Sequence, residues 1–176
     1  MAYKIMDWLG WTIKNDIELP KKYIICLAPH TTNWDFVYGL LFKSAIRLKA
    51  NFFMKKEWFR FPMGNFMRSL GGIPIDRGKK TKITDLIAAE FDKHDELCIG
   101  ITPEGTRSKT KNWKRGFYTI AEKTNVPIVL TYIDYKTKNV GFAKIYTISG
   151  DFDKDIVEIK KFFSQFSGKH PDRFDY

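Results

Sequence analysis

Residues 23–35 read YIICLAPHTTNWD, an apolar run that passes through a short polar turn into a segment with helical spacing. The run Tyr23–Ala28 has the length and the aliphatic content of a buried strand. From Asp35 to Leu48 the apolar residues recur with the period of an amphipathic helix. This strand–turn–helix unit is typical of α/β domains. It places His30 where the strand ends and Asp35 in the first turn of the helix.

The rest of the chain repeats this alternation of strands and helices. Further strands are expected at Asn51–Met54, Gly72–Ile75, Leu97–Thr102, Pro127–Ile133 and Val140–Ile148. Further helices are expected at Trp58–Leu70, Thr81–Lys93, Lys114–Thr124 and Asp153–Phe166. The length of 176 residues suits one core. We therefore expect a single α/β domain over residues 1–176, with a central, mostly parallel or mixed sheet flanked by helices.

The composition is that of a folded, basic protein. Apolar residues make up 44% and charged residues 28% of the chain, a balance typical of globular domains. The 30 Lys and Arg residues exceed the 20 Asp and Glu residues, giving a net charge of +10. This charge favours acidic partners such as phosphorylated metabolites, anionic lipid headgroups, acidic carrier proteins or nucleic acid. Charge alone does not choose among them.

Two features of the chain favour an intracellular location. No apolar stretch reaches the ~18 residues of a spanning helix, and the N-terminal residues lack the pattern of a secretory signal. Cys26 and Cys98 lie inside apolar runs and have no partner at metal-ligand spacing, so we expect both in the core.

A histidine and a carboxylate separated by four residues at a strand end can form a general base. If Asp35 accepts a hydrogen bond from one ring nitrogen of His30, the other nitrogen can take a proton from a hydroxyl. The carboxylate then stabilises the imidazolium, and the helix dipole favours an ionised Asp35. The alternative is a purely structural turn, with Thr31, Thr32 or Asn33 as the N-cap.

Two further clusters follow predicted strands, where open α/β sheets bind their ligands. Residues 71–77 close one strand with Arg77, and residues 102–108 close another with Glu104, Gly105 and Arg107. Arginine suits phosphate oxygens, and glycine lets the backbone approach a ligand closely. Taken singly, each cluster can also be a strand cap or a local ion pair in a turn.

Together, these segments resemble the glycerolipid acyltransferase superfamily, typified by bacterial 1-acylglycerol-3-phosphate acyltransferases. Members carry a His-x4-Asp motif, a Gly-x-Ile-x-Ile-Asp-Arg segment, a Pro-Glu-Gly-Thr-Arg-Ser segment and a strand containing Val-Pro-Ile-Val. The sequence has all four blocks in this order, at residues 30–35, 71–77, 103–108 and 126–129. The resemblance covers most of the chain between Tyr23 and Ile133.

The resemblance implies an O-acyltransferase that moves a fatty acyl group from coenzyme A or acyl carrier protein to the hydroxyl of an anionic lyso-lipid. It implies that His30 is the general base and that Asp35 orients it. It further implies that the acceptor is bound by Arg77, Glu104, Gly105, Thr106, Arg107 and Lys55. A thioester is already activated, so neither a metal nor another cofactor is required, and a positioned base contributes ~10²–10⁴-fold.

The sequence departs from the usual motifs at three positions. Pro29, Pro74 and Thr102 stand where the family often has asparagine, an aromatic residue and phenylalanine. These differences leave the chemistry intact. They leave the acceptor open among lysophosphatidic acid, other lyso-phospholipids and lyso-amino-acid lipids.

A lipid enzyme without a spanning helix is expected to contact the membrane peripherally, here at the inner, cytoplasmic face. Within residues 1–20 we expect an amphipathic helix with Ile5, Trp8, Leu9 and Ile13 on one face, and Trp8 and Trp11 suit a membrane interface. The alternative is that this helix packs on the domain. A second apolar set is expected to line an acyl-chain channel or to join the core: Trp58, Phe59, Phe61, Met63, Phe66 and Met67.

Two other functions stay open at this point. One is a phosphate-binding or nucleic-acid-binding module, suggested by the net charge of +10 and the 16% aromatic residues. Nucleic acid is not the expected partner, because most aromatic residues fall in apolar runs. The other is a thioester hydrolase in which His30 activates water. His94 and His170 lack the carboxylate spacing and strand-end context of His30, and we expect both at the surface.

Overall fold

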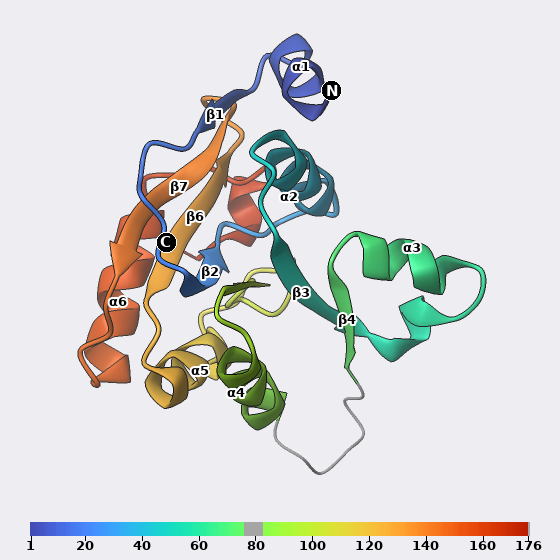
Figure 1. Cartoon of the computed structure of the whole chain (residues 1–176). Coiled ribbons are helices and arrows are strands. Elements are labelled where there is room, and N and C mark those ends of the chain that lie inside the picture. Colours follow the sequence, from blue (N-terminus) through green and yellow to red (C-terminus); the bar gives the residue numbers. More distant parts are fainter. Residues whose placement is uncertain (76–82, 176) are drawn as a thin grey trace.

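The computed structural model describes residues 1–75 and 83–175, in which a seven-stranded sheet is covered by helices on both faces (Figure 1). The strands are β1 (Thr12–Lys14), β2 (Lys22–Leu27), β3 (Ala50–Lys55), β4 (Gly72–Ile75), β5 (Leu97–Ile101), β6 (Ile128–Asp134) and β7 (Asn139–Tyr146). The helices are α1 (Ala2–Trp8), α2 (Trp34–Ala45), α3 (Met63–Ser69), α4 (Ile83–Lys93), α5 (Gly116–Thr124) and α6 (Phe152–Phe163). Two short 3₁₀ helices are η1 (Lys56–Phe59) and η2 (Pro171–Arg173).

The strand order across the sheet is β1-β7-β6-β2-β5-β3-β4. Strand β2 runs parallel to both β5 and β6, and β3 runs parallel to both β4 and β5. Strand β7 is antiparallel to β6 and parallel to the short edge strand β1. The predicted α/β fold with a mixed sheet flanked by helices is confirmed. Because β2, β5 and β6 are parallel neighbours, the loops that follow them lie at one edge of the sheet.

The side chains of β2 alternate between two cores, as the period of a strand requires. Ile24 and Cys26 point into a core covered by α4, α5 and α6, whereas Tyr23 and Ile25 point into a core covered by α1 and α2. Cys26 and Cys98 are both buried and free. The prediction that the two cysteines pack in the core is confirmed.

The helix predicted over Trp58–Leu70 is wrong as a single element. The chain forms η1, turns at residues 60–62, and starts α3 with Pro62 at its N-cap. Proline has no N–H to donate to the preceding turn and its ring clashes there, so a helix cannot continue through it. The segment instead forms a small lobe that stands out from the β3–β4 edge of the sheet (Figure 1).

The helix predicted within residues 1–20 is wrong beyond Trp8. Gly10, at a φ of 75°, turns the chain, and Thr12–Lys14 joins the sheet as β1. Ile13 therefore cannot share a helical face with Ile5. Trp11 is buried rather than interfacial, whereas Trp8 is 84% exposed. No helix in residues 1–75 and 83–175 has the length and apolarity to cross a bilayer.

Candidate active site

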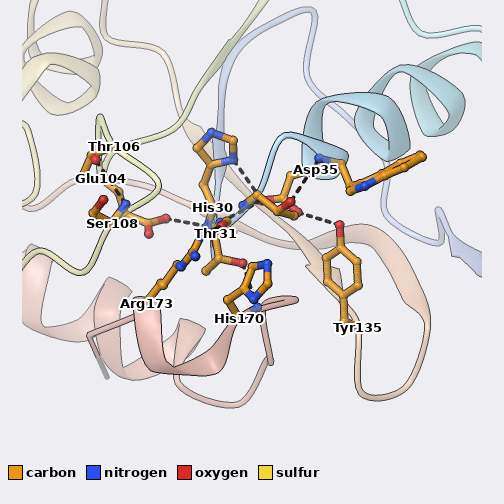
Figure 2. A network of polar contacts seen from close by, with 11 residues as sticks. His30, Thr31, Asp35, Glu104, Thr106, Ser108, Tyr135, His170 and Arg173 are labelled. Atoms are coloured by element: carbon orange, nitrogen blue, oxygen red, sulfur yellow. Dashed lines mark hydrogen bonds and ion pairs between the residues drawn. The ribbon is translucent and has the colours of Figure 1, made fainter.

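Three parallel strands carry the residues that meet at one edge of the sheet. His30 follows β2, Glu104 follows β5 and Tyr135 follows β6, and Figure 2 shows their side chains around the start of α2. The predicted site residues His30, Asp35 and Glu104 are thus brought together. Their position agrees with the general location of ligand sites in α/β sheets.

The imidazole of His30 is held by the carboxylate of Asp35. The Nδ1 atom of His30 lies 3.1 Å from Oδ2 of Asp35, whose side chain is buried in the first turn of α2. The same Oδ2 accepts hydrogen bonds from the backbone N–H groups of Thr31 at 2.8 Å and Thr32 at 3.0 Å. The turn therefore fixes the carboxylate, and the carboxylate fixes the ring. Nε2 of His30 has no hydrogen-bond partner among the described residues.

Tyr135 completes the environment of Asp35, and it is not among the site residues predicted from the sequence. Its hydroxyl donates to Oδ1 of Asp35 at 2.7 Å (Figure 2). Burial acts to raise the pKa of Asp35, but hydrogen bonds from His30, Tyr135 and Thr32 outweigh it and lower the pKa below its usual value. Burial and the bond to Asp35 raise the pKa of Tyr135, so its hydroxyl keeps its proton. The position of Tyr135 directly after a predicted strand was the available signal.

Glu104 supports the backbone of His30. Its Oε1 accepts the backbone N–H of His30 at 2.8 Å, and the residue is only 2% exposed. Burial, with a smaller contribution from the nearby negative charge of Asp35, raises the pKa of Glu104 to about 8. This carboxyl group is therefore mostly protonated at neutral pH.

The loop after Glu104 holds the other predicted residues of this motif. Gly105 has a φ of 67°, a conformation that favours glycine, and an added Cβ would lie 3.0 Å from Cγ of Lys114. Oγ1 of Thr106 accepts the backbone N–H of Ser108 at 3.2 Å. Arg107 is exposed and lines the same cavity as His30.

Lys55 and Arg77 are the two other residues predicted to contact phosphate. Lys55 is the last residue of β3, where it pairs in register with Ile75 of β4. Arg77 lies outside the described residues. Their contact with an acceptor stays a prediction.

The C-terminal segment packs against Thr31, which the sequence did not indicate. The backbone N–H of His170 donates to Oγ1 of Thr31 at 3.2 Å, and Nη1 of Arg173 donates to its carbonyl oxygen at 3.4 Å (Figure 2). His170 is half-buried there and keeps part of its surface exposed. The predicted surface position is confirmed for His94, an exposed residue beside Glu90.

A cavity of about 810 Å³ extends from His30 and Asp35 between α2 and the sheet. Most side chains that line it are apolar, and they come from α2 and from five strands: Phe36, Val37, Leu40 and Phe42; Ile25, Leu27, Phe52, Met54, Ile101, Ile133, Val140 and Phe142. Lys43 also lies in the lining. Its Nζ donates to the carbonyl oxygen of Leu70 at 2.5 Å. The cavity is a largely apolar space whose lining includes the candidate base.

The apolar set predicted for a channel or for the core divides in the structure. Trp58 and Met67 line the cavity, and Met67 is buried. Phe61, Met63 and Phe66 are exposed, so both interpretations are wrong for these three residues. Helical periodicity identifies an apolar face but not what covers it.

Comparisons with known proteins agree with this geometry. Residues 11–134 match the family model described as Acyltransferase. A search of curated protein sequences found no match. The crystal structure of the 1-acyl-sn-glycerophosphate (LPA) acyltransferase PlsC from Thermotoga maritima is similar, with a TM-score of 0.68 and 16% sequence identity, over 93% of this chain and 74% of that chain. At this identity the likeness concerns the fold. Because the family model spans more than half of the sequence, the chain belongs to the acyltransferase family, within the glycerolipid acyltransferase superfamily that its motifs resemble.

Proposed function

We propose that the protein transfers a fatty acyl group from a thioester, on coenzyme A or acyl carrier protein, to the hydroxyl of an anionic lyso-lipid. One observation carries this proposal: the His30–Asp35 pair lies in the lining of a largely apolar cavity. Asp35 occupies Nδ1 of the imidazole, which leaves Nε2 for the substrate. A base for a hydroxyl and a space for an acyl chain therefore adjoin.

The chemistry needs no group beyond the side chains and the two substrates. Nε2 of His30 takes the proton of the acceptor hydroxyl as its oxygen attacks the thioester carbonyl carbon, and the new C–O bond replaces the C–S bond. The departing thiolate takes the proton from the imidazolium. Asp35 stabilises that cation, and its lowered pKa keeps it ionised at neutral pH.

The cavity suits the fatty acyl chain. Its volume falls within the range of about 300–1,000 Å³ that is usual for ligand pockets. From Asp35 to Lys43, helix α2 rises about 12 Å along the cavity wall. Burying an apolar chain along such a wall supplies binding free energy at about 25 cal/mol per Å².

Acceptor recognition rests on the loop after β5. The guanidinium of Arg107 suits phosphate oxygens, and Gly105 allows a close backbone approach. We assign phosphate contacts to Arg107, Arg77 and Lys55, and further acceptor contacts to Gly105 and Thr106. In the structure Glu104 contacts the backbone of His30 instead, which supports a positioning role for it. We also propose that the protein works as a peripheral protein at the cytoplasmic face of the membrane.

The proposal is tested by measuring thiol release from long-chain acyl-CoA and from acyl carrier protein with a panel of lyso-lipids, and by mass spectrometry of the products. Acceptor-dependent release with an acylated acceptor supports it. The variant Arg107→Ala should raise KM for an anionic acceptor about tenfold or more. Arg115→Ala, which removes an exposed arginine paired with Glu122 on α5, should leave KM unchanged. Free fatty acid as the sole product would show a thioester hydrolase instead.

A further inference from the structure

The lobe between β3 and β4 exposes large apolar side chains. We call residues 56–69, which comprise η1, the following turn and α3, the aromatic lobe. Phe61 is 100% exposed, Trp58 55% and Phe66 54%, and Met63 is also exposed. Soluble surfaces rarely gather so many large apolar side chains, and such a patch commonly marks a binding surface.

The exposed residues belong to a compact element. An added Cβ on Gly64 would lie 2.3 Å from the carbonyl oxygen of Phe59, and Met67 of α3 is buried. The guanidinium of Arg68 lies over the ring of Phe59 at 5.3 Å. The lobe thus has its own packed interior and still directs Phe61 and Phe66 to the outside.

The charges of the aromatic lobe point to an anionic partner. Lys56, Arg60 and Arg68 are exposed, and Glu57 is the one acidic residue in this stretch of the sequence. Aromatic side chains mixed with Lys and Arg are typical of surfaces that lie at the membrane–water interface. Basic residues near an anionic leaflet strengthen binding to it.

The aromatic lobe also adjoins an opening of the cavity. Trp58 lines the cavity and is exposed, and on α2 the same is true of Phe36 and Val37. Phe36 packs edge-on against Phe52 of β3, with ring centroids 5.3 Å apart. The cavity therefore reaches the surface between α2 and the aromatic lobe, at an apolar rim.

Helix α1 lacks these features although it too exposes aromatic residues. Tyr3 and Trp8 are exposed, but α1 carries one lysine, Lys4, against one acid, Asp7. Among the described residues that line the cavity, none comes from α1. The two aromatic surfaces thus differ in charge and in their relation to the candidate active site.

We infer that the aromatic lobe inserts into the headgroup region of an anionic bilayer, so that the rim formed by Phe36, Val37 and Trp58 faces the lipid. A fatty chain then enters the cavity sideways while its polar head stays at the interface near His30. This inference rests on the proposed acyl transfer. An acidic carrier protein would also meet the basic residues, but a fully exposed Phe61 beside an apolar opening fits a lipid surface.

Binding to vesicles tests the inference directly. The probe is sedimentation with vesicles of equal parts phosphatidylcholine and phosphatidylglycerol, compared with phosphatidylcholine alone. The double variant Phe61→Ser with Phe66→Ser should weaken binding to the anionic vesicles at least about tenfold. The matched control, Tyr3→Ser with Trp8→Ser on α1, should bind as the wild type does. Equal binding by the lobe variant, or lost binding by the α1 variant only, would overturn the inference.

A fluorescent label reports insertion into the bilayer directly, without relying on a loss of vesicle binding. Because both native cysteines are buried, Phe61→Cys and Trp8→Cys each offer one accessible thiol for an environment-sensitive dye. The emission at position 61 should shift to the blue with anionic vesicles, and the emission at position 8 should not. No shift at position 61 would contradict insertion.

Activity assays separate this inference from the proposed function. With short-chain acyl-CoA and a water-soluble lyso-lipid, the lobe variant should be as active as the wild type, because Phe61 and Phe66 do not line the cavity. With the lyso-lipid embedded in vesicles its rate should fall about tenfold. Wild type inactive on both substrates would refute the proposed function. A lobe variant that bound vesicles normally but failed to bind acyl carrier protein would make the lobe a carrier-protein surface and refute the inference alone.

Discussion

Replacing the buried Glu104 with glutamine should stabilise the protein at alkaline pH. The carboxyl group accepts the backbone N–H of His30, and the amide oxygen of Gln can accept the same hydrogen bond. Burial raises the pKa of Glu104 to about 8, so the ionised form is unfavourable in the folded state. Glutamine resembles the protonated form and does not titrate. The variant Glu104→Gln thus removes the unfavourable charge and keeps the contact.

The pKa fixes the sign and the size of the effect. In the unfolded chain the carboxyl group has its ordinary value of 4.5, so between this pH and about 8 the folded state holds a proton that the unfolded state has lost. Wild-type stability therefore falls as the pH rises through this window and levels off above it. The full rise in pKa corresponds to an upper limit of about 5 kcal/mol. We expect Glu104→Gln to exceed the wild type by about 2–5 kcal/mol at about pH 9, and by little below about pH 4.5.

Denaturant unfolding followed by tryptophan fluorescence, at a series of pH values between these limits, measures the difference. Glu96→Gln is the control, because Glu96 is exposed and the same substitution there removes no buried carboxyl group. A difference between Glu104→Gln and wild type that stays constant with pH would refute the argument. It would mean that Glu104 titrates normally and that its burial carries no electrostatic cost.

Two further substitutions test the contacts that hold His30. Tyr135→Phe removes the donor to Asp35 and should destabilise the protein by about 1–3 kcal/mol at neutral pH. Because the lowered pKa of Asp35 stabilises the fold only while the carboxylate is ionised, this loss of stability should shrink on acidification. The control Tyr38→Phe, in the same cluster of aromatic rings, should show no such dependence on pH. An unchanged unfolding midpoint would contradict this role. Gly168→Ala would place a Cβ 2.7 Å from Cγ2 of Thr31. We expect it to destabilise the protein by about 1–3 kcal/mol in urea unfolding and to slow acyl transfer in the thiol-release assay. A variant as stable and as active as the wild type would argue against tight packing between Gly168 and Thr31.

The local part of the site was predictable from the sequence, and the distant part was not. His30 and Asp35 are five residues apart within one strand–turn–helix unit, so their spacing alone brings the ring to the carboxylate. Tyr135 reaches Asp35 across 100 residues, and that contact depends on β6 lying next to β2. No local pattern fixes the order of strands in a sheet. The contacts of His170 and Arg173 with Thr31 depend on tertiary packing in the same way.

The elements of the fold were likewise predictable where the local sequence determines them, and not where distant contacts do. The six longer strands were recognisable because buried parallel strands give continuous apolar runs. Strand β1 was missed because its three residues form a strand through pairing with β7, not through their own pattern. The exposed phenylalanines of the aromatic lobe carry the spacing of a buried helix face, so periodicity could not show that Phe61 and Phe66 point outward.

The most direct test of the account is acyl transfer by His30→Ala. With a long-chain acyl-CoA and the acceptor that supports wild-type turnover, we predict that His30→Ala loses at least about 100-fold in kcat while its unfolding transition stays cooperative. His94→Ala, which removes an exposed histidine beside Glu90, should retain wild-type kcat. A folded His30→Ala protein that transfers acyl groups at the wild-type rate would contradict the assignment of His30 as the base.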